Sequence, residues 1–144
     1  MQKIFALILM LGAVNASACS FPLVSLDRHV EDAEQIFIAT LLEAKVMPRD
    51  GDHQWPWIQG RFHVSKRLKG GPETADVTLM TGMVRGDCSI GMLVSAKYLV
   101  FKNISDTRLG ADTGTQIIED FQEEEFTSKI FAMVKRKNIQ PQQK

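Results

Sequence analysis

Two cysteines, Cys19 and Cys88, carry the most readily interpreted chemistry in this sequence. Cysteines oxidise to disulfides in exported proteins and stay reduced in the cytosol, so the compartment decides what the pair can do. Because the chain holds only these two, a bridge within it could join only Cys19 to Cys88. Closing so long a loop would stabilise the fold by about 4 kcal/mol on the loop-entropy account.

The first 18 residues have the features of a secretory signal peptide. Lys3 precedes an apolar run over residues 4–14, and residues 16–18 (Ala-Ser-Ala) have the small-x-small pattern that signal peptidase reads. The run is shorter than the roughly 20 apolar residues that a membrane span needs. We therefore expect a signal peptide over 1–18 and a secreted or periplasmic domain over 19–144, without a membrane span. A buried N-terminal strand or helix is the alternative.

A lipid anchor on Cys19 is a second use of the same cleavage site, because lipoprotein signals also end at a cysteine. Ser17 and Ala18 suit that motif, whereas Ala16 stands where a larger aliphatic residue is preferred. Lipidation would consume the thiol, block the amine and leave Cys88 unpaired. The lipid and the disulfide therefore exclude each other.

The remaining polar residues favour no enzymatic site. His29, His53 and His63 have no helical pair spacing, and the sequence contains no Cys-x-x-Cys, nucleophile elbow or phosphate-binding loop. The acidic run 123–125 is typical of a solvated helix start. We expect a non-enzymatic protein that holds no metal and no cofactor by itself.

Charge and aromatic residues limit the class of partner. Seventeen basic and seventeen acidic residues balance, which argues against nucleic acid as a partner. Trp55 and Trp57 flank a proline and either close one end of the fold or form an exposed contact for another protein. The tripeptide Arg85-Gly86-Asp87 matches an adhesion motif, but matches of three residues arise often by chance.

The apolar pattern predicts five strands followed by one helix. Alternation with a period of two favours strands over 36–47, 57–68, 77–82, 97–104 and 115–121. An apolar stripe after Asp120 favours a helix, with Asp120 and Glu123 forming its capping box. The first strand should place Ile36, Ile38, Leu42, Ala44 and Val46 on one face. The expected core comprises Ile36, Ile38, Leu42, Phe62, Val64, Leu68, Leu79, Leu99 and Phe101.

This order of elements favours a mainly β fold. Strands and helices do not alternate as a parallel sheet would require. The predicted architecture is a five-stranded, OB-fold-like antiparallel barrel with a C-terminal α-helix packed on it.

Four segments in order resemble the netrin-like (NTR) domain, specifically the N-terminal domain of the tissue inhibitors of metalloproteinases. They are Cys19-Ser20-Phe21-Pro22 at the mature terminus, "AEQIFIATLLEA", "FHVSKRLKGG" and "DCSIGMLVSAKYLVF". The likeness covers roughly residues 19–104 and implies an OB-type barrel. The chain departs from the family in having Phe21 where a second cysteine usually stands, and in lacking the further disulfides and the cysteine-rich C-terminal domain.

The resemblance implies inhibition of a zinc metalloprotease. In the family, the free amine and the carbonyl of the first cysteine occupy the open coordination position of the protease's zinc. Ser20 would then enter the specificity pocket, beside the loop that ends at Cys88. The implied contact ridge comprises Cys19, Ser20, Phe21, Pro22, Val84, Arg85, Gly86, Asp87 and Cys88. The alternative is a protein-binding or structural module of the cell envelope without inhibition.

Overall fold

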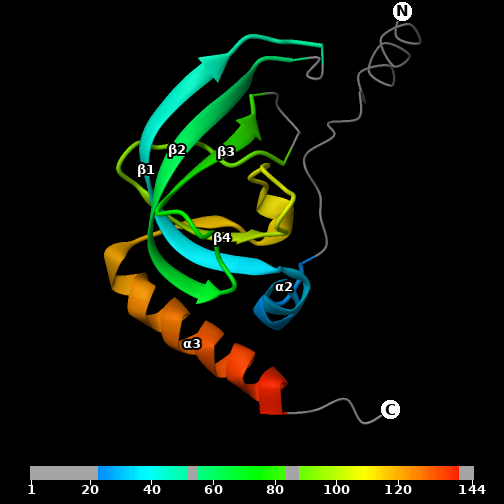
Figure 1. The fold of residues 1–144 in the computed structure, drawn as a ribbon, viewed down its shortest axis with the longest axis vertical. Helices are drawn as coiled ribbons and strands as arrows, with labels where there is room; N and C mark the ends of the chain where they lie inside the picture. The colour runs from blue at the N-terminus through cyan, green and yellow to red at the C-terminus, as the bar shows by residue number, and fades with distance from the viewer. Residues whose placement is uncertain (1–22, 52–54, 84–87, 140–144) are drawn as a thin grey trace, which may run out of the picture.

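A computed structural model describes residues 23–51, 55–83 and 88–139, the last two of them by their backbone alone. These described residues form one antiparallel sheet and two α-helices, with a short 3-10 turn (Figure 1). In chain order the elements are α2 (Leu26–Asp32), β1 (Gln35–Met47), β2 (Trp57–Lys69), β3 (Asp76–Gly82), β4 (Lys97–Lys102), η1 (Ala111–Thr113), β5 (Gln116–Ile118) and α3 (Asp120–Ile139).

The sheet has the strand order β3-β2-β1-β4-β5, and every neighbouring pair is antiparallel. The prediction of a mainly β protein with five antiparallel strands and a C-terminal helix is confirmed. The described sheet is open rather than closed into a barrel. The segment after β4 nevertheless runs parallel to β3, where Met80 N donates to Thr107 O at 2.8 Å and Leu109 N donates to Met80 O at 2.7 Å.

The sheet separates two apolar clusters. On its inner side lies the inner core, in which Phe62 and Tyr98 meet edge to face with ring centroids 5.2 Å apart. On its other side lies the helix-side core, which α2 and α3 cover as they pass beneath the lower half of the sheet (Figure 1). The strands are buried on both faces where they pass between these cores, and β4 is buried along nearly its whole length.

Eight of the nine predicted core side chains are buried, and Leu42 is the exception at 42% exposed. The cause is a β-bulge in β1. Leu41 pairs with Phe62 and Glu43 pairs with Arg61, which leaves Leu42 as an extra residue without a partner across the pair. The bulge reverses the alternation, so Ala44 packs on the inner core while Ile36 and Ile38 belong to the helix-side core. The expectation of one face running from Ile36 to Val46 is therefore wrong.

Helix α2 was not predicted, and its ends are held by residues of different elements. Ser25 Oγ accepts a hydrogen bond from Arg28 N at its start. At its end, Lys69 Nζ of β2 donates to Val30 O at 2.7 Å and to Ala33 O. Seven residues make a helix too short to be stable alone, so packing of Val30 and this lysine cap supply its stability. Burial lowers the pKa of Lys69.

The start of α3 differs from the expected capping box by one residue. Gln122 Oε1 accepts a hydrogen bond from Glu119 N at 2.9 Å. The side chain of the third helical residue therefore caps the residue that immediately precedes the helix. Asp120 is already helical, and β5 ends at Ile118 rather than continuing to residue 121. The carboxylates of Asp120 and Glu123 are thereby left for other partners.

Candidate functional site

The predicted contact ridge lies mostly outside the described residues. Cys19, Ser20, Phe21 and Pro22 fall in residues 1–22, and Val84, Arg85, Gly86 and Asp87 fall in 84–87. The proposed cleavage site also lies in the first of these stretches. Of the nine ridge residues, the structure describes Cys88 alone. The pairing of Cys19 with Cys88 therefore stays a prediction.

Cys88 is half-buried and anchored through its backbone. Its φ of 55° is unusual for a residue with a side chain. Its carbonyl oxygen accepts a hydrogen bond from Ala111 N at 3.0 Å, and the next residue, Ser89, bridges Gly110. Cys88 is thus fastened to the turn at η1, directly after the stretch that carries the predicted ridge loop.

A buried threonine ties the same region to β3. Thr81 Oγ1 accepts a hydrogen bond from Ile90 N at 3.1 Å and donates to Leu109 O at 3.3 Å. One side chain therefore links β3 to the segment after Cys88 and to the segment before η1. The segment that begins at Cys88 is therefore hydrogen-bonded to β3 and to the turn at η1, and Thr81 also joins it to Leu109.

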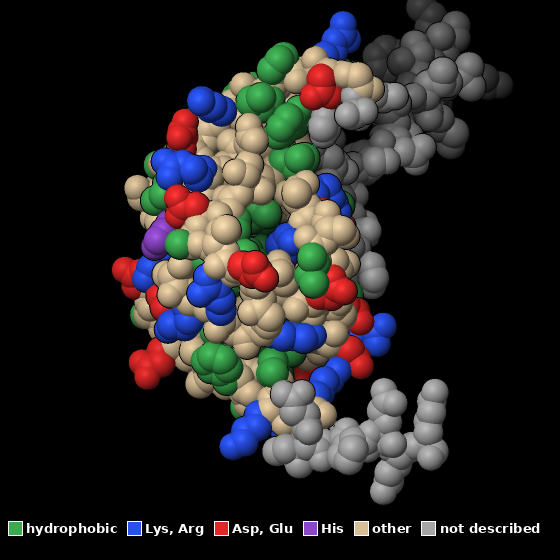
Figure 2. All heavy atoms as spheres, viewed as in Figure 1, with side chains coloured by type: hydrophobic (Ala, Val, Ile, Leu, Met, Phe, Trp, Pro, Cys, Tyr) green, Lys and Arg blue, Asp and Glu red, His purple; other side chains and the backbone are tan. Residues whose placement is uncertain are grey.

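The far ends of the first three strands carry exposed apolar side chains. Met47, Trp57 and Gly82 pair in a row across β1, β2 and β3, which brings these ends together. Beside that row, Val46 is 64% exposed and Trp55 62%, and Met83 is also exposed. We call Val46, Trp55 and Met83 the apolar rim. Hydrophobic side chains also gather over the upper part of the face in Figure 2.

The two tryptophans differ in how far they are exposed to solvent. Trp57 begins β2 and is half-buried, whereas Trp55 stands out from the surface. Trp55 is exposed, as a contact for another protein would require, and Met83 of the rim immediately precedes residues 84–87 in the chain. Of the three rim residues, Met83 alone is adjacent in sequence to the predicted ridge loop.

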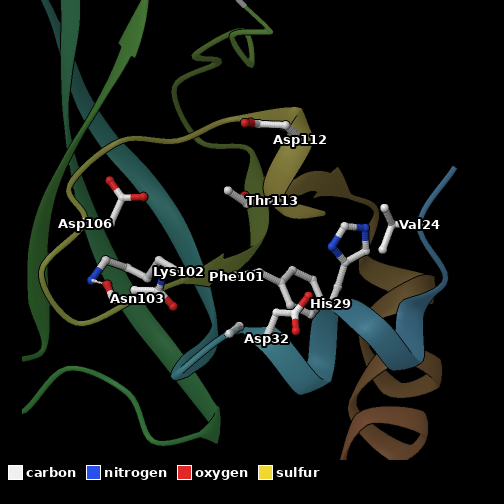
Figure 3. A pocket seen from close by; sticks show the side chains of 10 residues that line it. Val24, His29, Asp32, Phe101, Lys102, Asn103, Asp106, Asp112 and Thr113 are labelled. Carbon is white, nitrogen blue, oxygen red and sulfur yellow. Dashed lines mark hydrogen bonds between the residues drawn. The ribbon is translucent and has the colours of Figure 1, made fainter. Parts of the chain in front are cut away.

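A cavity of about 180 Å³ opens between α2, the end of β4 and η1 (Figure 3). His29 and Val24 approach it from one side, and Asp112 and Thr113 from the other. The ring of His29 packs on Phe101 with centroids 5.9 Å apart. Two of its three lining carboxylates are ion-paired, Asp32 with Arg28 at 2.9 Å and Asp112 with Arg108 at 2.8 Å. The third, Asp106, accepts a hydrogen bond from Arg108 N at 2.8 Å. The cavity thus offers a small polar recess with few uncommitted charges.

Lys102 lies beside this cavity and also lines a second one of about 330 Å³ against β3. It is buried, and burial lowers its pKa. Its Nζ donates to Asn103 O at 2.6 Å, to Ile104 O at 3.1 Å and to Gln35 Oε1 at 3.3 Å. These three acceptors use the donors of the ammonium group, so Lys102 stabilises the turn after β4 rather than offering a site for an anion.

Four charged residues join the start of α3 to the sheet. Glu123 accepts from Lys97 at 2.7 Å and from Lys66 at 2.9 Å, and Asp120 also bonds Lys97 at 2.9 Å. The Lys97 hydrogen bond, followed by that of Lys66, lowers the pKa of Glu123, and the same carboxylates raise the pKa of Lys97. Glu123 is only 20% exposed, so its expected role as a solvated helix start is wrong.

An exposed polar ladder crosses the outer face of β1, β2 and β3. His63 Nδ1 donates to Asp76 Oδ1 at 2.9 Å, and Arg61 bonds both Asp76 at 3.3 Å and Glu43 at 3.7 Å. The hydrogen bond from His63, followed by that from Arg61, lowers the pKa of Asp76. Within residues 23–51, 55–83 and 88–139, no three His, Cys, Asp or Glu side chains are grouped to hold a metal ion.

Comparison of the sequence with models of known protein families gives no match, and comparison with curated proteins gives none. In the part of the chain that the structure describes, no helix combines the length and apolar character of a membrane span.

Sequence reasoning missed two features of this region. The apolar rim joins residues distant in the chain, and only the pairing of β1 with β2 and of β2 with β3 brings them together. The role of Thr81 was also missed, because a threonine in a strand is common and its hydroxyl partners lie in other segments. The exposed tryptophan next to Pro56 was the one usable signal.

Proposed function

We propose that the mature chain is an exported, non-enzymatic protein-binding domain of the netrin-like type. In its most specific form, the proposal is that it inhibits zinc metalloproteases through Cys19 at its mature N-terminus. The amine and carbonyl of Cys19 would bind the protease's own zinc, Ser20 would enter the pocket beside it, and a disulfide to Cys88 would hold the terminus in place. The protein itself supplies no metal.

The anchoring of Cys88 is the observation that carries this proposal. An inhibitor of this kind needs a fixed partner for its terminal cysteine, because a terminus already held in place loses little entropy on binding. Cys88 meets that need through its carbonyl bond to Ala111 and the adjoining bridge from Ser89 to Gly110. The apolar rim, whose Met83 immediately precedes residues 84–87 in the chain, would add contact area of the kind found in protein interfaces.

The strand arrangement supports an OB-type barrel as the scaffold. The five strands are antiparallel, and the free edge of β3 is met in parallel by residues 107–109. That segment continues through η1 into β5, which pairs with β4 at the opposite end of the sheet. A partly open barrel, with the segment from 107 to 118 spanning the gap, accounts for these contacts.

The test compares two mature proteins against a panel of zinc metalloproteases. One begins at Cys19, and the other carries an additional alanine before it, which turns the amine into an amide and moves the free terminus away. We expect inhibition by the first and loss of inhibition by the second. Ser20→Arg should change which proteases are inhibited, because a bulky cation replaces a small side chain in the pocket. Equal inhibition by both forms would exclude chelation by the terminus.

A binding or structural module of the cell envelope without inhibition is the second candidate. The exposed Trp55 and Met83 favour it, since they offer a protein contact that needs no zinc. If neither form inhibits any protease of the panel, this function takes precedence. Peptide mapping without reductant and the mass of the N-terminal peptide decide whether Cys19 is bridged, lipidated or neither.

A further inference from the structure

The second half of β1 forms an open edge of the sheet. Residues 43–47 pair with β2 on one side. On the other side, β4 pairs with residues 35–40, and the two hydrogen bonds of Leu41 with Ala96 and Ser95 end the pairing. Among the described residues, no strand pairs with β1 beyond that point on this side. Figure 1 shows the upper part of β1 at the rim of the sheet, with β2 and β3 both to one side of it.

An open edge presents backbone donors and acceptors to any extended chain, and charged side chains usually restrict which chains can pair. Here the restriction comes from Glu43 and Lys45, which share the outer face of the strand. Lys45 Nζ lies 3.5 Å from Glu43 Oε1. Between them, Ala44 turns inward and packs against the inner core. The edge therefore carries one acid and one base, placed symmetrically about Ala44.

This arrangement complements itself in one antiparallel register. Directly opposite residues of an antiparallel pair share a face, so a twofold axis must pass through a residue of the strand rather than between two. An axis through Glu43 would oppose two carboxylates, and an axis through Lys45 would oppose two ammonium groups. An axis through Ala44 places each Glu43 opposite the Lys45 of the other strand. Of these three registers, the third alone makes two attractive pairs.

We propose that the edge of β1 pairs with the same edge of a second copy of this chain, antiparallel about Ala44. The interface is isologous, as twofold dimers require, and it joins two five-stranded sheets into one continuous sheet. An extended peptide of another sequence matches these charges only if it carries an acid and a base at the same spacing, which a second copy of the chain does by symmetry. The dimer is independent of the proposed protease inhibition.

Exposed apolar side chains border this edge and add to the buried area. Leu42 and Val46 lie two residues from Ala44 on either side and would be opposite one another in the pair. Leu93 and Val94 are also exposed, just before the Ser95 N–H that bonds Leu41 O. They therefore lie where β4 stops covering β1, next to the site of the partner strand. In the dimer, these side chains would bury apolar surface next to the short row of hydrogen bonds between the strands.

Charge reversal tests the register directly in the mature chain. Lys45→Glu makes both facing pairs acid against acid, and Glu43→Lys makes both base against base. Each variant alone should weaken self-association by at least about tenfold, measured by sedimentation equilibrium. Mixed together, the two variants should form a one-to-one heterodimer, because every facing pair is again of opposite sign. The double variant E43K/K45E should restore the homodimer.

Arg49→Glu is the matched control for Lys45→Glu, since it also replaces a base by an acid. Arg49 is an exposed loop residue outside the proposed strand pairing. It should leave self-association unchanged. Thermal melts check that every variant is folded, which matters for Glu43→Lys because Glu43 also contacts Arg61. The proposal is overturned if the unaltered chain is monomeric at roughly 100 μM, or if the two single variants fail to associate with each other while both are folded.

Discussion

Glu123 Oε2 of α3 lies 2.7 Å from Lys97 Nζ, at the first residue of β4. The same carboxylate reaches Lys66 of β2 through its other oxygen at 2.9 Å. A single side chain near the start of the C-terminal helix therefore spans two strands that are not neighbours, because β1 lies between them. This contact fixes how α3 lies across the sheet.

Replacing Glu123 should make the protein less stable and change its response to acid. The pKa of Glu123 is held below its ordinary value of 4.5, so its stabilising effect is present above about pH 4.5 and is lost as the pH falls through the lowered value. We expect Glu123→Gln to lower the free energy of unfolding by about 1 kcal/mol at neutral pH. In denaturant melts, the difference between the two proteins should shrink as the pH is lowered below 4.5.

Glu124→Gln is the control for that measurement, because Glu124 is exposed on the next position of the helix. It should change neither stability nor its dependence on pH. On the alkaline side, the same ion pair is lost as the pH rises above 10.5 through the raised pKa of Lys97. The ion-pair account is contradicted if Glu123→Gln and the unaltered protein keep the same difference in free energy of unfolding on acidification.

Two adjacent leucines test the β-bulge in β1. Leu41 is fully buried in the inner core, whereas Leu42 is the extra residue of the bulge and is 42% exposed. Leu41→Ala should cost about 2–5 kcal/mol, as expected for a cavity in a core, and Leu42→Ala less than about 1 kcal/mol. Urea denaturation of the two variants measures both values. Similar losses at both positions would place the bulge elsewhere.

Gly60 should resist replacement even by alanine. A β-carbon there would lie 2.7 Å from Met92 Sδ and 2.8 Å from side-chain carbons of Leu41 and Phe62. Because the latter two side chains are fully buried, relief requires repacking of the core, and Gly60→Ala should cost about 1–3 kcal/mol. Gly91→Ala is the control, since its β-carbon would meet no atom within 4 Å. If Gly60→Ala leaves the free energy of unfolding unchanged, the strands separate more easily than the packing indicates.

Thr81→Val should loosen the region around Cys88. Valine has nearly the shape of threonine but leaves Ile90 N and Leu109 O without their hydrogen-bond partner in a buried site. The expected cost is about 1–3 kcal/mol, and amide hydrogen exchange should increase around residues 88–90. Thr78→Val, on the exposed outer face of the same strand, should have little effect. If amide exchange near Ile90 is unchanged in Thr81→Val, the hydrogen bond from Ala111 N to Cys88 O and the bridge between Ser89 and Gly110 are enough to hold this region.

Several elements could be predicted because their signal is local. Alternating apolar residues indicated the strands, and eight expected core residues, Phe62 and Leu99 among them, are buried. The acidic start and basic end of the C-terminal helix were equally local features. The short helix α2 was missed because its stability comes from Lys69, a residue of β2 nearly forty positions later.

The sequence by itself determined the strand-rich pattern, the terminal helix, the balance of charge and the presence of a cysteine behind a secretory signal pattern. Each of these depends on neighbouring residues, whose periodicity and chemistry are visible along the chain. Only the tertiary structure decided which side of β1 each residue faces after Leu42, because a bulge depends on how β1 is matched against β2. It also decided that Glu123 is an ion-pair bridge and that residues 43–47 form an open edge, since both depend on which strands lie nearby in space.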